Sequence, residues 1–209
     1  MKRIVGGLLA ALCIAASALA QGDLKDRVDQ ALKKSTPQEI VAQLEREDGW
    51  GNVLATYHLG LMYRKGEGVP KDPARALAYF TRAGKDWVAR YQFKLGVPGA
   101  QYEAGLQYLK GEGTTQDAEV AAKWLRRAAE QGHGRAQLRL AEFYATDSPG
   151  KDMTQAFFWA SVAGNQFDLG KEEKEAAAAV QARARGAIGA AESDRVKQQA
   201  EGWSPRRML

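Results

Sequence analysis

The 209-residue chain contains one cysteine, Cys13, and two histidines, His58 and His133. Because Cys13 lies inside an apolar N-terminal segment, the rest of the chain can form neither a disulfide nor a thiol nucleophile. A metal site would need both histidines and carboxylates brought together from separate parts of the chain. The sequence therefore predicts no metal and no cofactor, and we expect the two histidines at surface or interhelix positions.

Long apolar runs and clusters of like charge are also scarce. No second long apolar run follows the first twenty residues, and no cluster of five or more Lys and Arg occurs anywhere. Without Lys2 and Arg3, 28 basic residues stand against 25 acidic ones, so the remaining net charge is only mildly positive. This pattern indicates neither nucleic acid nor an anionic lipid surface as a partner, and it predicts no transmembrane segment beyond the N-terminus.

Residues 1–20 have the pattern of an export signal. Lys2 and Arg3 precede an apolar, alanine-rich stretch, and Ala18-Leu19-Ala20 places small residues where a signal peptidase cleaves. A membrane anchor would ordinarily be longer and less rich in alanine. We therefore expect a cleaved signal peptide over residues 1–20, a mature N-terminus at Gln21 and a periplasmic or secreted protein.

The most informative feature of the remaining chain is internal repetition. A pattern of aromatic, small and acidic residues returns after 45 residues, and a third, shorter copy follows 36 and then 35 residues later. Self-similarity at this period indicates stacked pairs of helices. The matched positions are Tyr57, Gly60, Tyr63, Gly66, Gly68, Asp72, Ala76, Tyr79 and Ala83; Tyr102, Gly105, Tyr108, Gly111, Gly113, Asp117, Ala121, Trp124 and Ala128; and Ala136, Ala141, Tyr144, Ala156, Trp159 and Ala163.

Each copy reads as a helix A, a turn and a helix B. The Gly-x-Gly pairs suit the end of helix A, since glycine adopts the left-handed backbone of a helix C-cap, and Asp72 and Asp117 suit the N-cap of helix B. Small residues at 60, 105 and 141 should let helices approach closely, while Tyr79 and Trp124 should fill the space between neighbours. The fold class predicted is all-α, an α-solenoid of stacked antiparallel helix pairs with helical caps at both ends.

The array is expected to occupy residues 51–165, with an insertion at about 84–99. A helical N-terminal cap should cover 21–50, with one helix over Asp23–Lys34 and a second that begins at the capping box Thr36-Pro37-Gln38-Glu39. A C-terminal cap should cover 166–209, as a long helix over 171–201, broken near Gly186 and Gly189, and a frayed tail unless Trp203 docks back.

The second copy carries a specific resemblance. The frame Ala100-Gln101-Tyr102-x-x-Gly105-x-x-Tyr108-x-x-Gly111-x-Gly113, followed by Asp117, Ala121, Trp124, Ala128-Ala129 and Gly132, resembles the Sel-one-like repeat family. That family is a branch of the tetratricopeptide-like helical repeats. The resemblance implies a right-handed superhelix that acts as an adaptor or scaffold, and exported bacterial members take part in envelope or host-facing interactions. Some relatives are cross-linked by disulfides, which this chain cannot share.

Three patterns that could suggest chemistry are better explained by structure. Ser148-Pro149-Gly150-Lys151 matches the Ser-x-x-Lys motif of penicillin-recognising enzymes, but its residues flank a turn and no accompanying motif is present. Gly66-Glu67-Gly68 and Gly111-Glu112-Gly113 end helices and follow no strand, so they are turns instead of nucleotide sites. We therefore predict no enzymatic activity.

The surface expected to bind a partner lies on the A helices, which line the concave side of a curved array. The side chains between the packing positions there would contact a protein or peptide of the cell envelope. Two alternatives stay open, namely an envelope enzyme acting on cell-wall or β-lactam-type substrates and a structural subunit that self-assembles. The predicted partner-binding residues are Tyr57, Leu61, Arg64, Lys65, Tyr102, Leu106, Leu109, Lys110 and Glu142.

Overall fold

The computed structural model describes residues 36–85, 95–146 and 150–206. Within these ranges every regular element is an α-helix. Two compact units are present: one comprises the chain up to Ala100 together with Glu112–Thr115, and the other comprises Gln101–Gly111 and the chain from Gln116 onward. The expected signal peptide, the expected helix over 23–34, the central part of the insertion and Ser148 lie outside the described residues.

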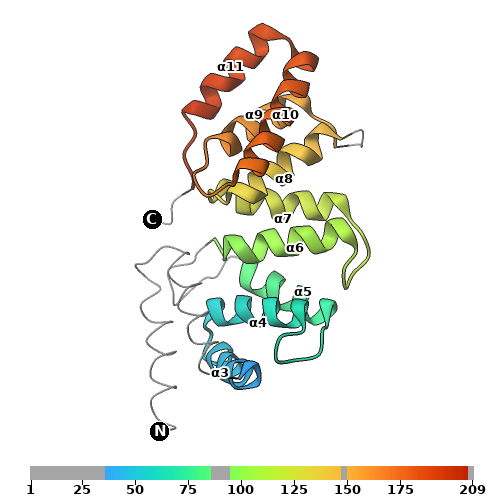
Figure 1. Ribbon diagram of the computed structural model, residues 1–209, viewed down its shortest axis with the longest axis vertical. Helices are drawn as coiled ribbons and strands as arrows, with labels where there is room; N and C mark the ends of the chain where they lie inside the picture. Colours follow the sequence, from blue (N-terminus) through green and yellow to red (C-terminus); the bar gives the residue numbers. More distant parts are fainter. Residues whose placement is uncertain (1–35, 86–94, 147–149, 207–209) are drawn as a thin grey trace. The chain divides into compact units, whose positions relative to one another are not determined.

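The first unit contains helices α3 (Pro37–Gly49), α4 (Val53–Lys65) and α5 (Pro73–Gly84), with α3 packed on α4 and α4 packed on α5 (Figure 1). The α4–α5 pair is the first predicted repeat, and α3 belongs to the predicted N-terminal cap. Apolar side chains from α3 and α4 form one core, which partly buries Val69 and Tyr79 as well. The core residues are Ile40, Val41, Leu44, Ala55, Leu59 and Met62.

The helix ends of this unit follow the predicted local chemistry. The Thr36 hydroxyl accepts a hydrogen bond from the Glu39 N–H, and the Glu39 carboxylate accepts one from the Thr36 N–H, which completes the capping box. Asp72 Oδ1 accepts a hydrogen bond from the Arg75 N–H at 2.9 Å, as an N-cap should. Gly66 closes α4 with a φ of 81°, in the left-handed region.

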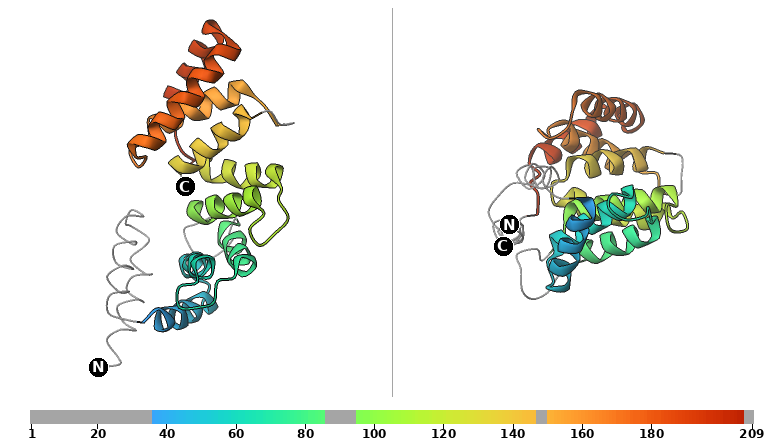
Figure 2. Two further views of the ribbon diagram at one scale, coloured as in Figure 1. Left: turned by 45° about the vertical axis from the view of Figure 1, so that its right-hand side comes forward. Right: turned by 60° about the horizontal axis from the view of Figure 1, so that its bottom comes forward.

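The second unit contains most of α6 (Pro98–Lys110), followed by α7 (Ala118–Glu130), α8 (Gly134–Ala145), α9 (Met153–Gly164), α10 (Lys171–Ile188) and α11 (Ala190–Glu201). Asp117 and Asp152 cap α7 and α9 in the way that Asp72 caps α5. The two terminal helices, α10 and α11, both pack against α9 and run in different directions from the turn between them (Figures 1 and 2). The largest core cluster of the described residues lies among these helices.

The long helix predicted over 171–201 is two helices that meet at Gly189. The backbone of Gly189 has a φ of 84° and a ψ of 169°, a conformation that a side chain would strain. Gly186 lies inside α10, so the helix continues through Gly186 and ends only at Gly189.

The tail beyond α11 is docked, so the prediction of a frayed end is wrong for residues 203–206, and the alternative that Trp203 docks back holds. The Trp203 ring meets Trp159 edge-on at a centroid distance of 5.9 Å. Arg206 donates its backbone N–H to the carbonyl oxygen of Glu130 at 2.8 Å, and its guanidinium pairs with the Glu130 carboxylate at 3.2 Å. The tail therefore reaches back to the end of α7.

Close approach of helices depends on matched small and large residues. A Cβ on Gly60 would lie 2.6 Å from the Phe80 ring, and one on Gly105 would lie 2.7 Å from Leu125 Cγ. Phe80 and Leu125 stand 45 residues apart, and the third copy has Ala141 and Ala160 at the corresponding places. The predicted close crossings at 60 and 105 are therefore filled by a large side chain from helix B.

The B-helix aromatics are less buried than predicted. Tyr79 and Trp124 are half-buried, whereas the next residues, Phe80 and Leu125, are completely buried. Successive residues point about 100° apart on a helix, so only one of each pair can face the core. Trp159 is 4 % exposed because the tail covers it, and there the prediction of a core aromatic is correct.

Candidate protein-binding surfaces

The four candidate residues in the first unit lie on one side of α4. Tyr57, Leu61 and Arg64 are half-buried, Lys65 is exposed, and their spacing of four, three and one residues places them along one face of a helix. Tyr57 is also part of the packing, since its ring lies 6.0 Å from that of Phe80. Leu61 is apolar and only half-buried, so its side chain is the best candidate contact here.

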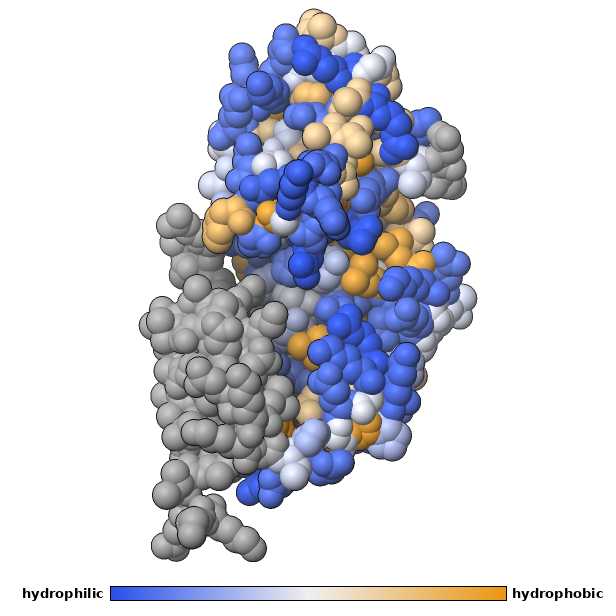
Figure 3. All heavy atoms as spheres, viewed as in Figure 1, coloured by the Kyte–Doolittle hydropathy of each residue, from blue (hydrophilic) through white to orange (hydrophobic). Residues whose placement is uncertain are grey.

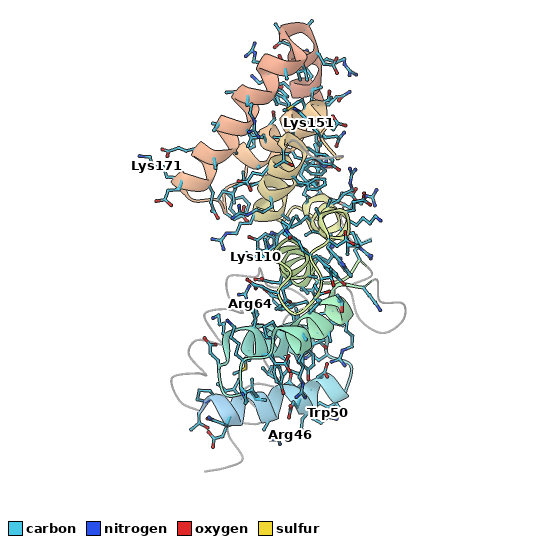
Figure 4. All side chains as sticks on the ribbon, turned by 90° about the vertical axis from the view of Figure 1, so that its right-hand side faces the viewer. Arg46, Trp50, Arg64, Lys110, Lys151 and Lys171 are labelled. Carbon is cyan, nitrogen blue, oxygen red and sulfur yellow. The ribbon has the colours of Figure 1, made fainter. Side chains whose placement is uncertain are left out.

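The candidates on α6 in the second unit form a matching face. Tyr102, Leu106, Leu109 and Lys110 follow a spacing of four, three and one residues, and they are half-buried except for the exposed Lys110. Leu109 and Tyr102 also pack against the large core, which leaves Leu106 as the leucine outside it. Figure 4 shows Arg64 and Lys110 at the C-terminal ends of α4 and α6, each within its own unit.

Within the second unit, the faces of α6 and α8 meet at Tyr102. The Tyr102 ring stacks on His133 with centroids 4.7 Å apart, and its hydroxyl forms a hydrogen bond with Arg139 of α8. Burial raises the pKa of Tyr102, and Arg139 opposes that effect. Arg139 in turn donates to the Glu142 carboxylate at 2.8 Å. The structure thus brings the candidates Tyr102 and Glu142 into one network, which we call the α6–α8 face.

The α6–α8 face is charged at its α8 side. Arg135 donates to the Glu173 carboxylate at 2.8 Å, which extends the network to the first turn of α10. The Gly170 N–H and Arg135 both favour the ionised carboxylate, so the pKa of Glu173 is lowered. The face therefore combines the apolar Leu106 with fixed arginine and glutamate groups, a composition that suits a polar protein surface.

Sequence reasoning did not find a recurrent contact between arginine and aromatic rings. Arg82 lies over the Tyr79 ring at 5.1 Å, and Arg127 lies over Trp124 at 5.3 Å. Both arginines follow the aromatic residue by three positions, so the signal was present in the repeat. These contacts explain how half-buried rings on helix B tolerate water, because the guanidinium covers the ring face.

The two histidines lie on α4 and at the start of α8. His133 is the N-cap of α8, where Nδ1 accepts a hydrogen bond from the Ala136 N–H at 3.3 Å. Burial lowers the pKa of His58 and of His133 to about 4. In the described part of the chain, no three His, Cys, Asp or Glu side chains are grouped as metal ligands would be.

Among residues 36–85, 95–146 and 150–206, no helix combines the length and the hydrophobicity needed to cross a membrane. The face shown in the space-filling view is mostly hydrophilic, with small hydrophobic areas between hydrophilic ones (Figure 3). Trp50 and Phe167 are exposed large hydrophobic side chains, 72 % and 94 % accessible, and they stand singly in different units. Isolated residues of this kind are ordinary on protein surfaces.

Comparison with known proteins identifies the repeats. The Sel1 repeat model matches residues 53–86, 98–133 and 134–166, which correspond to α4–α5, α6–α7 and α8–α9. No curated protein matches the chain. The crystal structure of a Sel1 repeat protein from Oxalobacter formigenes is similar with a TM-score of 0.60 and 21 % identity, covering 82 % of this chain and 67 % of that one.

A protective antigen of uropathogenic Escherichia coli with an SLR fold is 23 % identical over 81 % of this chain and 44 % of its own length, with a TM-score of 0.33. The first of these likenesses supports the fold alone, an all-α solenoid. Sel1 repeat proteins are generally scaffolds for protein interactions, and such folds are typically non-catalytic. With three matched repeats that coincide with its helix pairs, the chain belongs to the Sel1 repeat family.

Proposed function

We propose that this chain is an exported scaffold that binds a protein or peptide partner through the faces of its A helices, without catalysis. The observation that carries the proposal is the α6–α8 face, where Tyr102 joins Leu106 on one helix to Arg139 and Glu142 on the next. An apolar side chain beside fixed charges supplies both an anchor and polar specificity. In the other unit, Leu61 beside Arg64 and Lys65 on α4 has the same composition.

Export is the second part of the proposal. It rests on Lys2 and Arg3, on the apolar stretch after them and on the small residues of Ala18-Leu19-Ala20. A partner in the cell envelope or outside the cell follows from export. The absence of catalysis is proposed because the family fold is typically non-catalytic and because the chain's one Ser-x-x-Lys motif lacks its accompanying elements.

Site-specific photocrosslinking tests the α6–α8 face. A photoreactive phenylalanine analogue is placed at position 106 of the full chain, and at position 123 on the exposed side of α7 as the matched control. We expect a discrete adduct in the producing cells from position 106 and none from position 123. Equal adducts from both positions, or none from either, would contradict the proposed face.

Mutation then separates binding from folding. Leu106 is half-buried and is not part of the large core of α7–α11, so Leu106→Ser should leave the thermal unfolding temperature close to that of the parent. The same change should abolish the interaction with the crosslinked partner, measured with purified proteins. Leu109→Ser is the comparison variant, since Leu109 packs against the core and its loss should destabilise the fold by about 1–3 kcal/mol. A large loss of stability in Leu106→Ser would place that leucine in the core instead.

A further inference from the structure

A second surface lies where the C-terminal helices α10 and α11 meet α9, the last helix of the third matched Sel1 repeat. A cleft of about 560 Å³ opens between α9, α10 and α11, all within the second unit. The face of the molecule over α10 and α11 mixes hydrophobic and hydrophilic residues (Figure 3). The cleft exists because α10 and α11 diverge at Gly189 while both pack on α9.

The floor and one wall of the cleft are apolar. Phe157 and Ala160 of α9 are buried, and Ala178 and Ala182 of α10 face the cleft one turn apart. Because all but one of these side chains are alanines, the space between the helices stays unfilled. A guest side chain of moderate size could occupy it, since binding pockets of a few hundred cubic ångströms are typical of small ligands and short peptide segments.

The polar groups of the cleft favour an extended backbone. Gln181 Nε2 donates to Ser161 Oγ at 2.8 Å, and Ser161 Oγ donates to the Phe157 carbonyl oxygen at 2.8 Å. This chain of bonds fixes the Gln181 amide, whose Oε1 accepts no hydrogen bond from residues 150–206 and can accept a backbone N–H from a ligand. The Ser161 hydroxyl is already committed to a helix carbonyl, so its role here is structural.

The charge of the rim selects the ligand. Lys174, Arg185 and Lys197 line the cleft with one carboxylate, Asp194. Two of these cations form ion pairs with the protein's own carboxylates, and both pairs have long N···O distances: 3.7 Å between Arg185 and Asp194, and 3.9 Å between Lys197 and Glu201. Lys174 has no ion pair with the described residues. Exposed pairs at such distances contribute little, so the cations can turn to a ligand carboxylate at small cost.

We propose that this cleft binds a short acidic peptide segment of a partner protein. An apolar side chain of the peptide would pack against Phe157 and Ala178, and its carboxylates would pair with Lys174, Arg185 and Lys197. The site is separate from the α6–α8 face and does not need that face to bind. Charge complementarity is the reason for choosing an acidic segment, because three cations surround one carboxylate at the opening.

Selection from a random peptide library tests the proposal. The library is depleted on the full chain carrying Ala178→Trp, which fills the cleft from an exposed position, and is then enriched on the parent. We expect the selected peptides to be rich in Asp and Glu with one apolar residue. Failure to enrich any peptide, or enrichment of neutral or basic peptides, would overturn the proposal.

Charge-reversal variants then locate the contact by fluorescence polarisation with the best peptide. Lys174→Glu and Lys197→Glu should each weaken binding at least about tenfold, and the peptide with its acids changed to amides should lose a similar factor. Lys123→Glu on α7 is the matched control and should change binding less than twofold. Thermal melts confirm that each variant is folded.

Leu106→Ser distinguishes this site from the proposed scaffold face. Peptide binding that survives Leu106→Ser but is lost in Lys174→Glu supports the cleft even if the α6–α8 face proves to bind nothing. If peptide binding is lost in Leu106→Ser but kept in Lys174→Glu and Lys197→Glu, the peptide binds the α6–α8 face and the proposed cleft site is wrong. Binding that the lysine reversals leave unchanged overturns it in any case.

Discussion

The contact between Gly105 and Leu125 allows a quantitative test of how the helix pairs are built. A Cβ on residue 105 would lie 2.7 Å and 2.9 Å from Leu125 Cγ and Cδ2, and 3.3 Å from the Ala121 carbonyl oxygen. The first two contacts are far inside the optimal carbon separation of about 3.5–4.0 Å, so even a methyl group at position 105 must displace Leu125.

Two effects of opposite sign determine the stability of Gly105→Ala. Replacing glycine by alanine inside a helix stabilises by about 1 kcal/mol when there is room. Overpacking costs about 1–3 kcal/mol. We therefore expect Gly105→Ala to be neutral or to destabilise the protein by up to about 2 kcal/mol. Gly186→Ala in α10 is the matched control, since a Cβ there meets nothing within 4 Å, and it should stabilise by about 0.5–1 kcal/mol.

Removing the obstacle should reverse the sign. Leu125→Ala alone should cost about 2–5 kcal/mol, as expected for a completely buried leucine. In its presence Gly105→Ala fills part of the vacated space and reproduces the Ala141–Ala160 combination of the third repeat. The double-mutant cycle should give a coupling of about 1–3 kcal/mol, measured by urea unfolding followed by circular dichroism. Additive effects, or a Gly105→Ala variant as stable as Gly186→Ala, would refute the close contact.

Three further predictions concern pH, the tail and export. His58 and His133 have pKa values of about 4 in the folded protein, below the ordinary 6.5, so the folded state binds their protons less readily than the unfolded state does. As the pH falls, protonation of the unfolded state therefore lowers the free energy of unfolding. Each histidine should contribute about 2 kcal/mol of stability at pH 7 that is lost by pH 5. His133→Asn keeps a capping acceptor and should roughly halve the histidine part of that loss in urea titrations at the two pH values; an unchanged slope would contradict it. Trp203→Ala should lower stability by about 1–2 kcal/mol and expose Trp159, seen as a red shift of tryptophan fluorescence, whereas an unshifted spectrum would mean that the tail does not cover the ring. Intact-mass analysis of the exported protein should show Gln21 as its first residue, and a retained Met1–Ala20 segment would disprove cleavage.

The parts of the fold that depend on neighbouring residues in the chain could be predicted well. The capping box at Thr36, the caps at Asp72 and Asp117 and the left-handed Gly66 need only a side chain and the backbone within three or four residues of it. The repeat period then gave the order of helices, because each copy repeats the same local signals.

The orientation of side chains toward the core was harder to predict. Tyr79 and Phe80 are adjacent and both aromatic, and the sequence cannot show which of them faces Gly60 without the crossing angle of the two helices. On α4 and on α6 the candidate residues each follow one face of their own helix, but the division between Leu106 and the core-packed Leu109 depends on the neighbouring helix. The cleft beside α10 could not be predicted at all, since it results from the direction that α11 takes after Gly189.

The docked tail changes how the second unit should come apart. In a stacked array each layer ordinarily contacts only its neighbours, so unfolding can begin at an end and proceed layer by layer. Here Arg206 contacts Glu130, which lies 76 positions earlier in the sequence. The third repeat and both terminal helices lie between these two residues in the chain. This contact adds a coupling between layers that are not nearest neighbours, so α11 cannot peel away from the end while Arg206 stays bound. The C-terminal end of the solenoid should therefore open as one cooperative block, α8 to α11 together, instead of fraying helix by helix.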